Sequence, residues 1–450
     1  MWGFLTCMND ILIPYVKEVF ELSHFQSMFV QFYFFGAYFV GSVLYFVISA
    51  KYGDPIARMG YQRGAVFGLL IAGAGALLFY PATTLHSFNL ILAGLFVFGL
   101  GFTLLQISAN PYVIAIGPEA TASSRLNLCQ GVNSLGTTLA PLIGGGLILR
   151  RLGEEGSHGS DALRMPYLVF AGVLFALAFF FSRAKLPRIL PPGTIQRGTK
   201  VLGMPSVQLG MFAIFCYVGA EVSIGSIMVD FFGLEEIAGL EKDVASDYLA
   251  LYWGGLMVGR FLGAITVSGL STQTKVGAVL VVPVIGFFLI AYMFSVSAGG
   301  DYLGTLALLK PYALVLVLNL AAFALGASKP ARTIGIFALA CVVLLGIAIT
   351  QGGQLAFWSV IAVGLFNSIM WSNIFALTIQ GLGKYQSQAS SLLVMAIVGG
   401  SLLPLVQGAL ADSVGIQKSF LIPLVAYLYI AFYGLWGKSM GRGSDTTVFE

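Results

Sequence analysis

The sequence predicts an all-α protein that crosses a membrane many times. Apolar runs of about 20 residues recur along the chain, each bounded by glycine, proline or charged residues, as membrane-spanning helices require. Of the 450 residues, 58% are hydrophobic and only 9% are charged. Soluble globular chains carry about 25% charged residues, so this chain lacks the surface of a water-soluble protein.

About fourteen spans are expected, and each boundary is set to within a few residues. The first span is short, because Asp10 stands only nine residues after the start. Either the chain begins further upstream or this helix begins within the bilayer. The expected spans cover residues 1–16, 25–50, 65–82, 88–116, 123–149, 165–182, 205–231, 246–268, 275–297, 309–327, 331–350, 355–382, 387–410 and 419–437.

The lysines and arginines are distributed unevenly between the two sides of these spans. With the N-terminus in the cytoplasm, fifteen of the 23 fall on the cytoplasmic side and seven on the other. Cytoplasmic loops are enriched in lysine and arginine, so both termini are expected to be cytoplasmic. Residues 183–204, which hold five basic residues and no acid, are then a cytoplasmic linker, and residues 438–450 are a cytoplasmic tail.

Two short internal similarities indicate a duplicated chain. The segment GAYFVGSVL from Gly36 resembles GGLMVGRFL from Gly254, an offset of 218 residues. The segment TLAPLIGGGL ending at Leu147 resembles SLLPLVQGAL ending at Leu410, an offset of 263 residues. The offsets differ by 45 residues, about the length of two short membrane helices and a tight turn.

This pattern predicts two parallel six-helix halves, residues 1–182 and 205–437, with an inserted helix pair at about 275–327 in the second half. In transporters built from such halves, the substrate site lies at the membrane midplane between them. The inserted pair contains few polar residues, so we expect it to face lipid outside the second half.

Amide and acidic side chains recur inside the apolar spans, where they are costly unless they face a bundle interior or a watery cavity. They are Asn9 and Asp10 in the first span, Gln106 and Asn110 in the fourth, Asn127, Gln130 and Asn133 in the fifth, Glu221 in the seventh, and Asn367 and Asn373 in the twelfth. Gln106 and Asn110 are four residues apart and share one helical face. We interpret the set as a cavity lining, although any single asparagine can instead bond a neighbouring helix.

The amides suit a sugar. Each one offers a donor and an acceptor, so paired amides can hold adjacent hydroxyl groups. A sugar that loses its water shell needs such partners. Trp371 could cover the apolar face of a sugar ring.

Other function classes have no support in the sequence. The chain has four cysteines and three histidines, and these form no metal-ligand spacing, no nucleophile–base pair and no phosphate-binding loop. The net charge of +4 comes from loop lysines and arginines and does not indicate a nucleic-acid surface. We therefore expect neither an enzyme nor a resident cofactor.

Five segments carry a family resemblance. MNDILIP, ANPYVIAIGPE, RLNLCQGVNSLG, FCYVGAE and FNSIMWSNIFALTIQGLGKY resemble the fucose–proton symporter family of the major facilitator superfamily, above all its glucose/galactose transporter branch. The resemblance covers nearly the whole chain outside the inserted pair. It implies a two-half rocker-switch fold and cation-driven sugar uptake across a bacterial inner membrane. By the same resemblance, Asp10 matches an essential acid of the first helix, and Gln130 and Asn133 match substrate-contacting amides.

Three departures from the family pattern stand out. The first helix is truncated, two helices are inserted, and Gln106 stands where the fucose symporters have a glutamate.

The favoured function is uptake of a neutral hexose, glucose or galactose, by a monomer. N-acetylglucosamine, mannose or fucose remain alternatives, because amide side chains do not encode hydroxyl stereochemistry legibly. A membrane sugar sensor that does not transport is the alternative from another class. The predicted sugar contacts are Asn9, Asn110, Asn127, Gln130, Asn133, Asn367, Trp371 and Asn373.

The predicted coupling-ion residues are Asp10, Glu221 and Gln106. A glutamine cannot change its protonation state, so Asp10 and Glu221 are the deep titratable groups that remain. Sodium binds to a cage of carboxylate and carbonyl oxygens, to which Asp10, Gln106 and Asn110 could contribute. The sequence therefore favours sodium over the proton, and proton coupling through Asp10 alone stays open.

Overall fold

The computed structural model of the chain describes residues 1–118, 121–144, 162–187, 199–382 and 385–437. The expected tail at 438–450, the middle of the expected linker and the end of the expected fifth span lie outside this description. All regular secondary structure within the described ranges is helical. The expectation of an all-α protein is confirmed.

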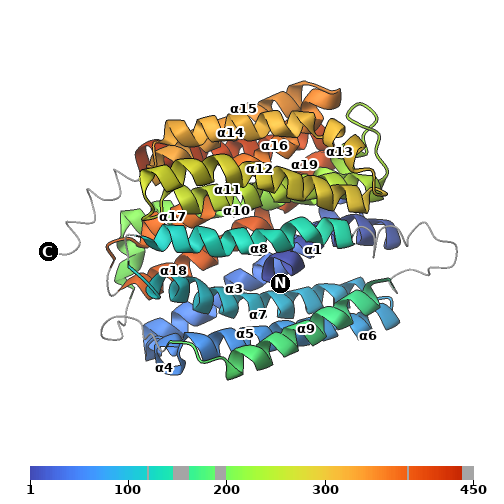
Figure 1. Ribbon diagram of the computed structural model, residues 1–450. Helices are drawn as coiled ribbons and strands as arrows, with labels where there is room; N and C mark the ends of the chain where they lie inside the picture. The colour runs from blue at the N-terminus through green and yellow to red at the C-terminus, as the bar shows by residue number, and fades with distance from the viewer. Residues whose placement is uncertain (119–120, 145–161, 188–198, 383–384, 438–450) are drawn as a thin grey trace.

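We call the helices before residue 184 the N-terminal helices and those after residue 204 the C-terminal helices. The N-terminal helices are α1 (Trp2–Val19), α2 (His24–Ser27), α3 (Phe29–Tyr52), α4 (Pro55–Met59), α5 (Tyr61–Leu77), α6 (Phe79–Thr84), α7 (Phe88–Ala115), α8 (Ala122–Gly144) and α9 (Arg164–Arg183). The longer ones run side by side (Figure 1).

The C-terminal helices begin after a short 3₁₀ turn, η5 (Lys200–Gly203). They are α10 (Pro205–Phe232), α11 (Lys242–Thr266), α12 (Thr272–Ser297), α13 (Tyr302–Leu308), α14 (Lys310–Gly326), α15 (Pro330–Thr350), α16 (Gly353–Asn367), α17 (Met370–Ile379), α18 (Gln386–Met395), η7 (Ala396–Val398), α19 (Gly399–Val414), α20 (Ile416–Ser419), α21 (Leu421–Phe432) and η8 (Tyr433–Gly437).

Helices begin and end at residues that suit a helix terminus. Pro205 and Pro330 occupy the first turns of α10 and α15, where a missing N–H costs nothing. Ser87 and Ser271 cap α7 and α12 by accepting hydrogen bonds from the backbone N–H groups three residues on. Gly53 ends α3 at φ +88°, a conformation that a residue with a Cβ rarely adopts.

Eleven helices in the described residues are long and apolar enough to cross a membrane, and the bent pair α13–α14, with its 55° angle, raises that number to twelve. The chain is therefore a multi-pass membrane protein. The expected count of about fourteen is not confirmed by this criterion. The two long helices that fall outside it are α1 and α8, which also carry many of the amides and acids.

The helices pack in two comparable arrangements. Among the N-terminal helices, α5 packs against α7 and α9, and α3 packs against α7. Among the C-terminal helices, α15 packs against α16 and α21, and α11 packs against α16. The two groups meet where α8 packs along α11, where α3 packs along α18 and α19, and where α1 reaches α10.

The pair formed by α12 and α13–α14 lies at the periphery of the bundle, where α12 also contacts α8 of the N-terminal helices. Helix α12 packs on α11, and α14 packs on α15 and α16. Tyr312 donates to the Leu251 carbonyl at 3.0 Å, and Asn319 donates to the Leu365 carbonyl at 3.2 Å. Large apolar side chains of this pair are exposed, including Leu280, Val284, Ile285, Tyr292, Leu303, Leu314 and Val317. The polar groups of the pair thus bind it to the bundle, and its apolar face points away from the bundle.

A charged cluster joins the two groups of helices where α1 and α10 end. Lys17 Nζ lies 2.7 Å from Asp230 Oδ2, and His24 Nδ1 lies 3.2 Å from the same oxygen. Close by in sequence, Lys242 of α11 donates to Glu18 of α1 at 2.7 Å. These ion pairs hold the ends of α1, α10 and α11 together.

Candidate functional site

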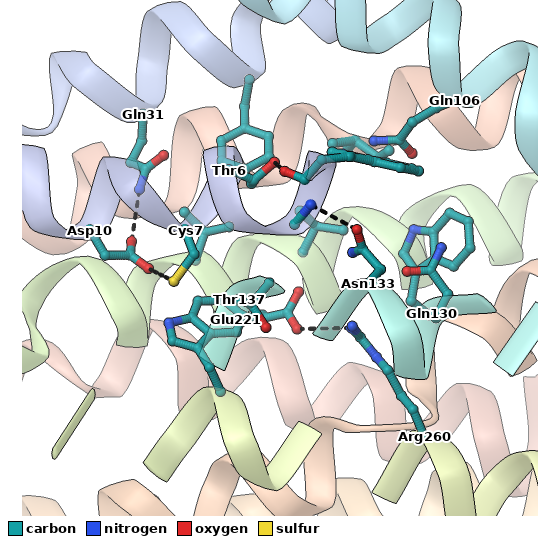
Figure 2. A pocket seen from close by; sticks show the side chains of 18 residues that line it. Thr6, Cys7, Asp10, Gln31, Gln106, Gln130, Asn133, Thr137, Glu221 and Arg260 are labelled. Atoms are coloured by element: carbon teal, nitrogen blue, oxygen red, sulfur yellow. Dashed lines mark hydrogen bonds and ion pairs between the residues drawn. The ribbon is translucent and has the colours of Figure 1, made fainter. Parts of the chain in front are cut away.

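A polar cavity lies where the N-terminal and C-terminal helices meet (Figure 2). Its wall combines side chains from α1, α3, α7 and α8 with side chains from α10, α11 and α17. The polar lining residues are Thr6, Asp10, Gln31, Gln106, Gln130, Asn133, Thr137, Glu221 and Arg260, and three tryptophans, Trp2, Trp253 and Trp371, complete much of the wall.

Asp10 lies on the α1 side of the cavity and is only 2% exposed. Its Oδ1 accepts from Gln31 Nε2 of α3 at 3.0 Å and from Ser226 Oγ of α10 at 3.4 Å. The Cys7 thiol, one turn earlier on α1, faces Oδ2 at 3.6 Å. A Cβ at Gly225 would lie 3.1 Å from Oδ2, so a glycine on α10 leaves room for this carboxylate. Asp10 is therefore bonded to helices of both groups.

Gln31 organises the neighbourhood of Asp10. Its Nε2 donates to Asp10 and also to Ser226 Oγ, at 2.9 Å, and its Oε1 accepts from Asn9 Nδ2 at 3.3 Å. Asn9 is fully buried behind Gln31 and is absent from the cavity wall. Asn9 thus supports the wall through Gln31.

Three amides form another part of the wall. Gln106 comes from α7, and Gln130 and Asn133 come from α8, all facing the same space (Figure 2). Asn133 Oδ1 accepts from the backbone N–H of Gly3 at 2.7 Å. That bond satisfies one of the unpaired N–H groups at the start of α1 and ties α1 to α8.

Glu221 and Arg260 supply the charge of the C-terminal wall. Glu221 Oε1 lies 3.6 Å from an Arg260 guanidinium nitrogen, and it also accepts from Tyr217 Oη at 2.7 Å. Both side chains are almost fully buried, with 11% and 8% of their surfaces exposed. A buried acid with an adjacent guanidinium is the arrangement expected where isolated charge would be too costly.

Three of the predicted asparagines make contacts between helices and do not line the cavity. Asn127 on α8 donates to Asn373 Oδ1 on α17 at 3.3 Å, and Ser123 donates to the same oxygen at 3.0 Å. Asn367 is fully buried between two tyrosines. Its Nδ2 donates to Tyr252 Oη at 2.8 Å, and its Oδ1 accepts from Tyr427 at 2.5 Å.

Asn110 also lies outside the cavity, although it shares a helix with Gln106. It is 3% exposed, and no hydrogen-bond partner reaches its Nδ2 within the described residues. The expected sodium ligands, Asp10, Gln106 and Asn110, are therefore not gathered around one space. Among the described residues, no group of three or more His, Cys, Asp or Glu side chains could hold a metal ion.

Sequence reasoning missed several residues of the wall, of which Gln31 and Arg260 make the most polar contacts; the others include Thr6, Thr137, Trp2 and Trp253. Gln31 and Arg260 carry the signal used for the other site residues, a polar side chain within an apolar span. Gln31 stands alone in an aromatic run, MFVQFYFF, and Arg260 follows the glycine-rich segment GGLMVG. A lone polar residue in a span is often an interhelical contact, so neither residue could be told apart from that alternative.

Comparison with known proteins relates this cavity to a family. No protein-family model matches the chain. A solved structure of the Escherichia coli fucose:proton symporter FucP covers 97% of this chain and 95% of that one, with a TM-score of 0.68 and 24% identity. FucP is a major facilitator superfamily transporter, so the two chains share that fold. Over 442 residues the sequence is 40% identical to a glucose/galactose transporter of Brucella abortus, with 97% of this chain and 92% of that protein covered.

The chain belongs to the fucose–proton symporter family, in its glucose/galactose transporter branch. A second member, the putative glucose/galactose transporter of Helicobacter pylori, is 33% identical over 459 residues and covers 99% of this chain. These relatives are named as transporters and not as enzymes. Within this chain, Asp10, Gln130 and Asn133, the residues that the family resemblance singles out, all line the one cavity.

Proposed function

We propose that the protein takes up a neutral hexose, glucose or galactose, by symport with protons. The observation that carries this proposal is the cavity itself, in which amides of α7 and α8 face the same space as a buried acid of α1. Membership of the glucose/galactose transporter branch supports the choice of sugar.

The amide wall is the proposed sugar site. Gln106, Gln130 and Asn133 present donors and acceptors to the hydroxyl groups of the sugar. These amide groups replace the water molecules that the sugar loses on binding. Asn133 Oδ1 already accepts from Gly3, so its NH₂ group is the part offered to the sugar. Trp371, stacked on Phe375 at 5.0 Å, offers an aromatic face to the apolar side of the ring.

We assign structural roles to the predicted residues that lie outside the wall. Asn127 and Asn373 join α8 to α17, and Asn367 bridges two tyrosines. Asn9 orients Gln31. Asn110 is removed from the set of sugar contacts because it does not reach the cavity.

Asp10 is the proposed coupling group. As a carboxylate it accepts hydrogen bonds from Gln31 of α3 and Ser226 of α10. Once protonated, it loses its charge, and the two hydrogen bonds at Oδ1 lose their charge-assisted strength. Because Ser226 belongs to the C-terminal helices, the protonation state of Asp10 is coupled to the contact between the two groups.

Two observations favour the proton over sodium. Asn110 lies outside the cavity, so the oxygen cage expected for sodium loses a member. A relative that is 26% identical over 458 residues is named an L-fucose-proton symporter.

The two buried acids of the cavity differ in their partners. Glu221 faces Arg260, whereas no cationic side chain lies within ion-pair distance of Asp10 in the described part of the chain. We therefore assign proton transfer to Asp10.

We also propose that α1 and α8 cross the bilayer, which gives fourteen spans. Their 18 and 23 residues correspond to about 27 and 35 Å of helix, close to the roughly 30 Å of a bilayer core. Their polar residues lower the mean hydropathy, and several of them, including Asp10, Gln130 and Asn133, face the cavity. Two halves, residues 1–182 and 205–437, account for the matched packing of α5 with α7 and α9 and of α15 with α16 and α21. The pair α12–α14 is then the insertion.

The remaining topology follows from the charge distribution. Both termini are placed in the cytoplasm, and the protein in the inner membrane of a bacterium, with residues 183–204 as the linker between the halves. The cavity is built entirely within one chain, so a monomer is the proposed working unit.

The test is uptake of labelled glucose and galactose into proteoliposomes, with a pH gradient and a sodium gradient imposed separately. We expect accumulation with the pH gradient in sodium-free buffer. Accumulation only with sodium would contradict proton coupling. Binding of sugar without movement across the membrane would favour the sensor. Competition by unlabelled N-acetylglucosamine, mannose and fucose tests the choice of sugar.

A further inference from the structure

Arg260 is a buried arginine in the cavity whose contacts reach both groups of helices. It lies on α11 and is 7% exposed. Within the C-terminal helices, its Nε donates to the Ser368 carbonyl at 3.1 Å, at the break between α16 and α17, and its Nη2 lies 3.6 Å from Glu221. Toward the N-terminal helices, its Nη1 donates to Ser134 Oγ on α8 at 2.5 Å.

The contact with Ser134 lies next to the proposed sugar site. Ser134 directly follows Asn133 and lies one turn after Gln130, whose carbonyl accepts from Ser134 Oγ at 2.9 Å. The same stretch of α8 therefore carries two wall amides and the hydroxyl that receives Arg260. Any shift between Arg260 and Ser134 moves those amides relative to the C-terminal wall.

The guanidinium group of Arg260 explains why its contacts have a fixed geometry. A guanidinium has five N–H groups in a rigid plane, so it holds several acceptors at fixed angles. Its charge is compensated within the C-terminal helices by Glu221. Glu221 and Ser368 lie in the C-terminal helices, as Arg260 does, whereas Ser134 lies in the N-terminal helices. Of these contacts of Arg260, only the bond to Ser134 joins the two groups of helices.

We propose that Arg260 is a positioning residue for transport, which aligns the amide face of α8 with the C-terminal wall while Glu221 balances its charge. The inference rests on the proposed function, since the amides of α8 are taken as the sugar contacts. Arg260 acts through Ser134 and Glu221 and is not assigned a bond to the sugar.

The first test compares two serines that each join the two groups of helices. Ser134→Ala removes the acceptor of Arg260, and Ser401→Ala removes a partly buried bond to the Phe32 carbonyl, 2.9 Å long, outside the cavity. In exchange of labelled glucose across proteoliposomes, we expect Ser134→Ala to raise KM about threefold or more. We expect Ser401→Ala to leave KM at the wild-type value. Equal KM values for the two variants would overturn the positioning role.

The second test concerns the charge. Arg260→Gln leaves Glu221 buried without its cation, and the double variant Arg260→Gln/Glu221→Gln removes both charges. The unfolding temperature in detergent should fall in the single variant and recover in the double variant, and Arg260→Lys should retain more exchange than Arg260→Gln. A double variant no more stable than Arg260→Gln would refute the pairing. If the wild type exchanges no hexose, the proposed function fails, and the unfolding comparison still decides whether Arg260 and Glu221 are paired.

Discussion

The two walls of the cavity handle buried polarity differently. The N-terminal wall combines neutral amides with Asp10, whose hydrogen-bonding partners are Gln31, Ser226 and Cys7. The C-terminal wall holds Glu221 next to Arg260. An acid with neutral partners can exchange a proton without leaving an opposite charge uncompensated, whereas a compensated pair resists a change of charge. The comparison suggests that coupling and the hydrogen bonds to the sugar reside on the N-terminal wall, and alignment on the C-terminal wall.

The largest expected effect comes from Asp10→Asn, which removes the proposed proton site and keeps the shape of the side chain. Accumulation of glucose driven by a pH gradient should fall to an inside-to-outside ratio near one. Exchange of labelled for unlabelled sugar should persist, because exchange needs no net proton transfer. Proteoliposome uptake and counterflow measure the two quantities.

Glu18→Gln is the matched control for Asp10→Asn. Glu18 is an acid on the same helix, but it does not line the cavity and pairs with Lys242. The Glu18→Gln protein should accumulate sugar as the wild type does. An Asp10→Asn protein that still concentrates sugar would remove Asp10 from the coupling step.

The next effect tests the amide wall. Gln130→Ala should raise the KM for exchange about tenfold, because the loss of one or two hydrogen bonds to the sugar costs roughly 1.4 kcal/mol. Gln407→Ala is the control, since Gln407 is a buried amide that bonds Ser419 outside the cavity. Equal KM values for the two variants would argue against a sugar contact at Gln130.

A third effect separates the cavity amides from the asparagines between helices. Asn367→Ala leaves the hydroxyls of Tyr252 and Tyr427 without their shared partner. The stability of the folded protein should fall by about 1–3 kcal/mol, with KM unchanged. Thermal unfolding and exchange kinetics on the same preparation measure both. A raised KM with unchanged stability would return Asn367 to the sugar site.

The smallest effect concerns the charged cluster at the ends of α1 and α10. Lys17 and Asp230 are 24% and 12% exposed, and His24 also faces Asp230. Lys17→Gln should therefore lower stability by about 1 kcal/mol or less, and by less still in high salt. The unfolding temperature at two salt concentrations checks this. If Lys17→Gln lowered the unfolding temperature as much as Arg260→Gln does, solvent exposure would not distinguish the Lys17–Asp230 pair from the Arg260–Glu221 pair.

Much of this molecule is determined by local sequence properties. Hydropathy is a property of consecutive residues, so the apolar runs predicted a helical membrane protein and placed helices where α3, α7, α10 and α15 are found. The same reasoning identified Asp10, Gln106, Gln130, Asn133 and Glu221, because a polar side chain in such a run must face something other than lipid. The short similarities between distant segments predicted an extra helix pair at about 275–327, and α12 and α14 are the helices found in that range.

Tertiary structure alone decided what each polar side chain faces. Asn127 and Asn133 lie on one helix, yet the first meets Asn373, 246 residues away, and the second lines the cavity. Gln31 and Arg260 belong to the wall because α3 and α11 turn those particular faces inward. The direction of a side chain depends on helix rotation and on the neighbours that packing brings close, and neither is encoded in the local pattern of residues.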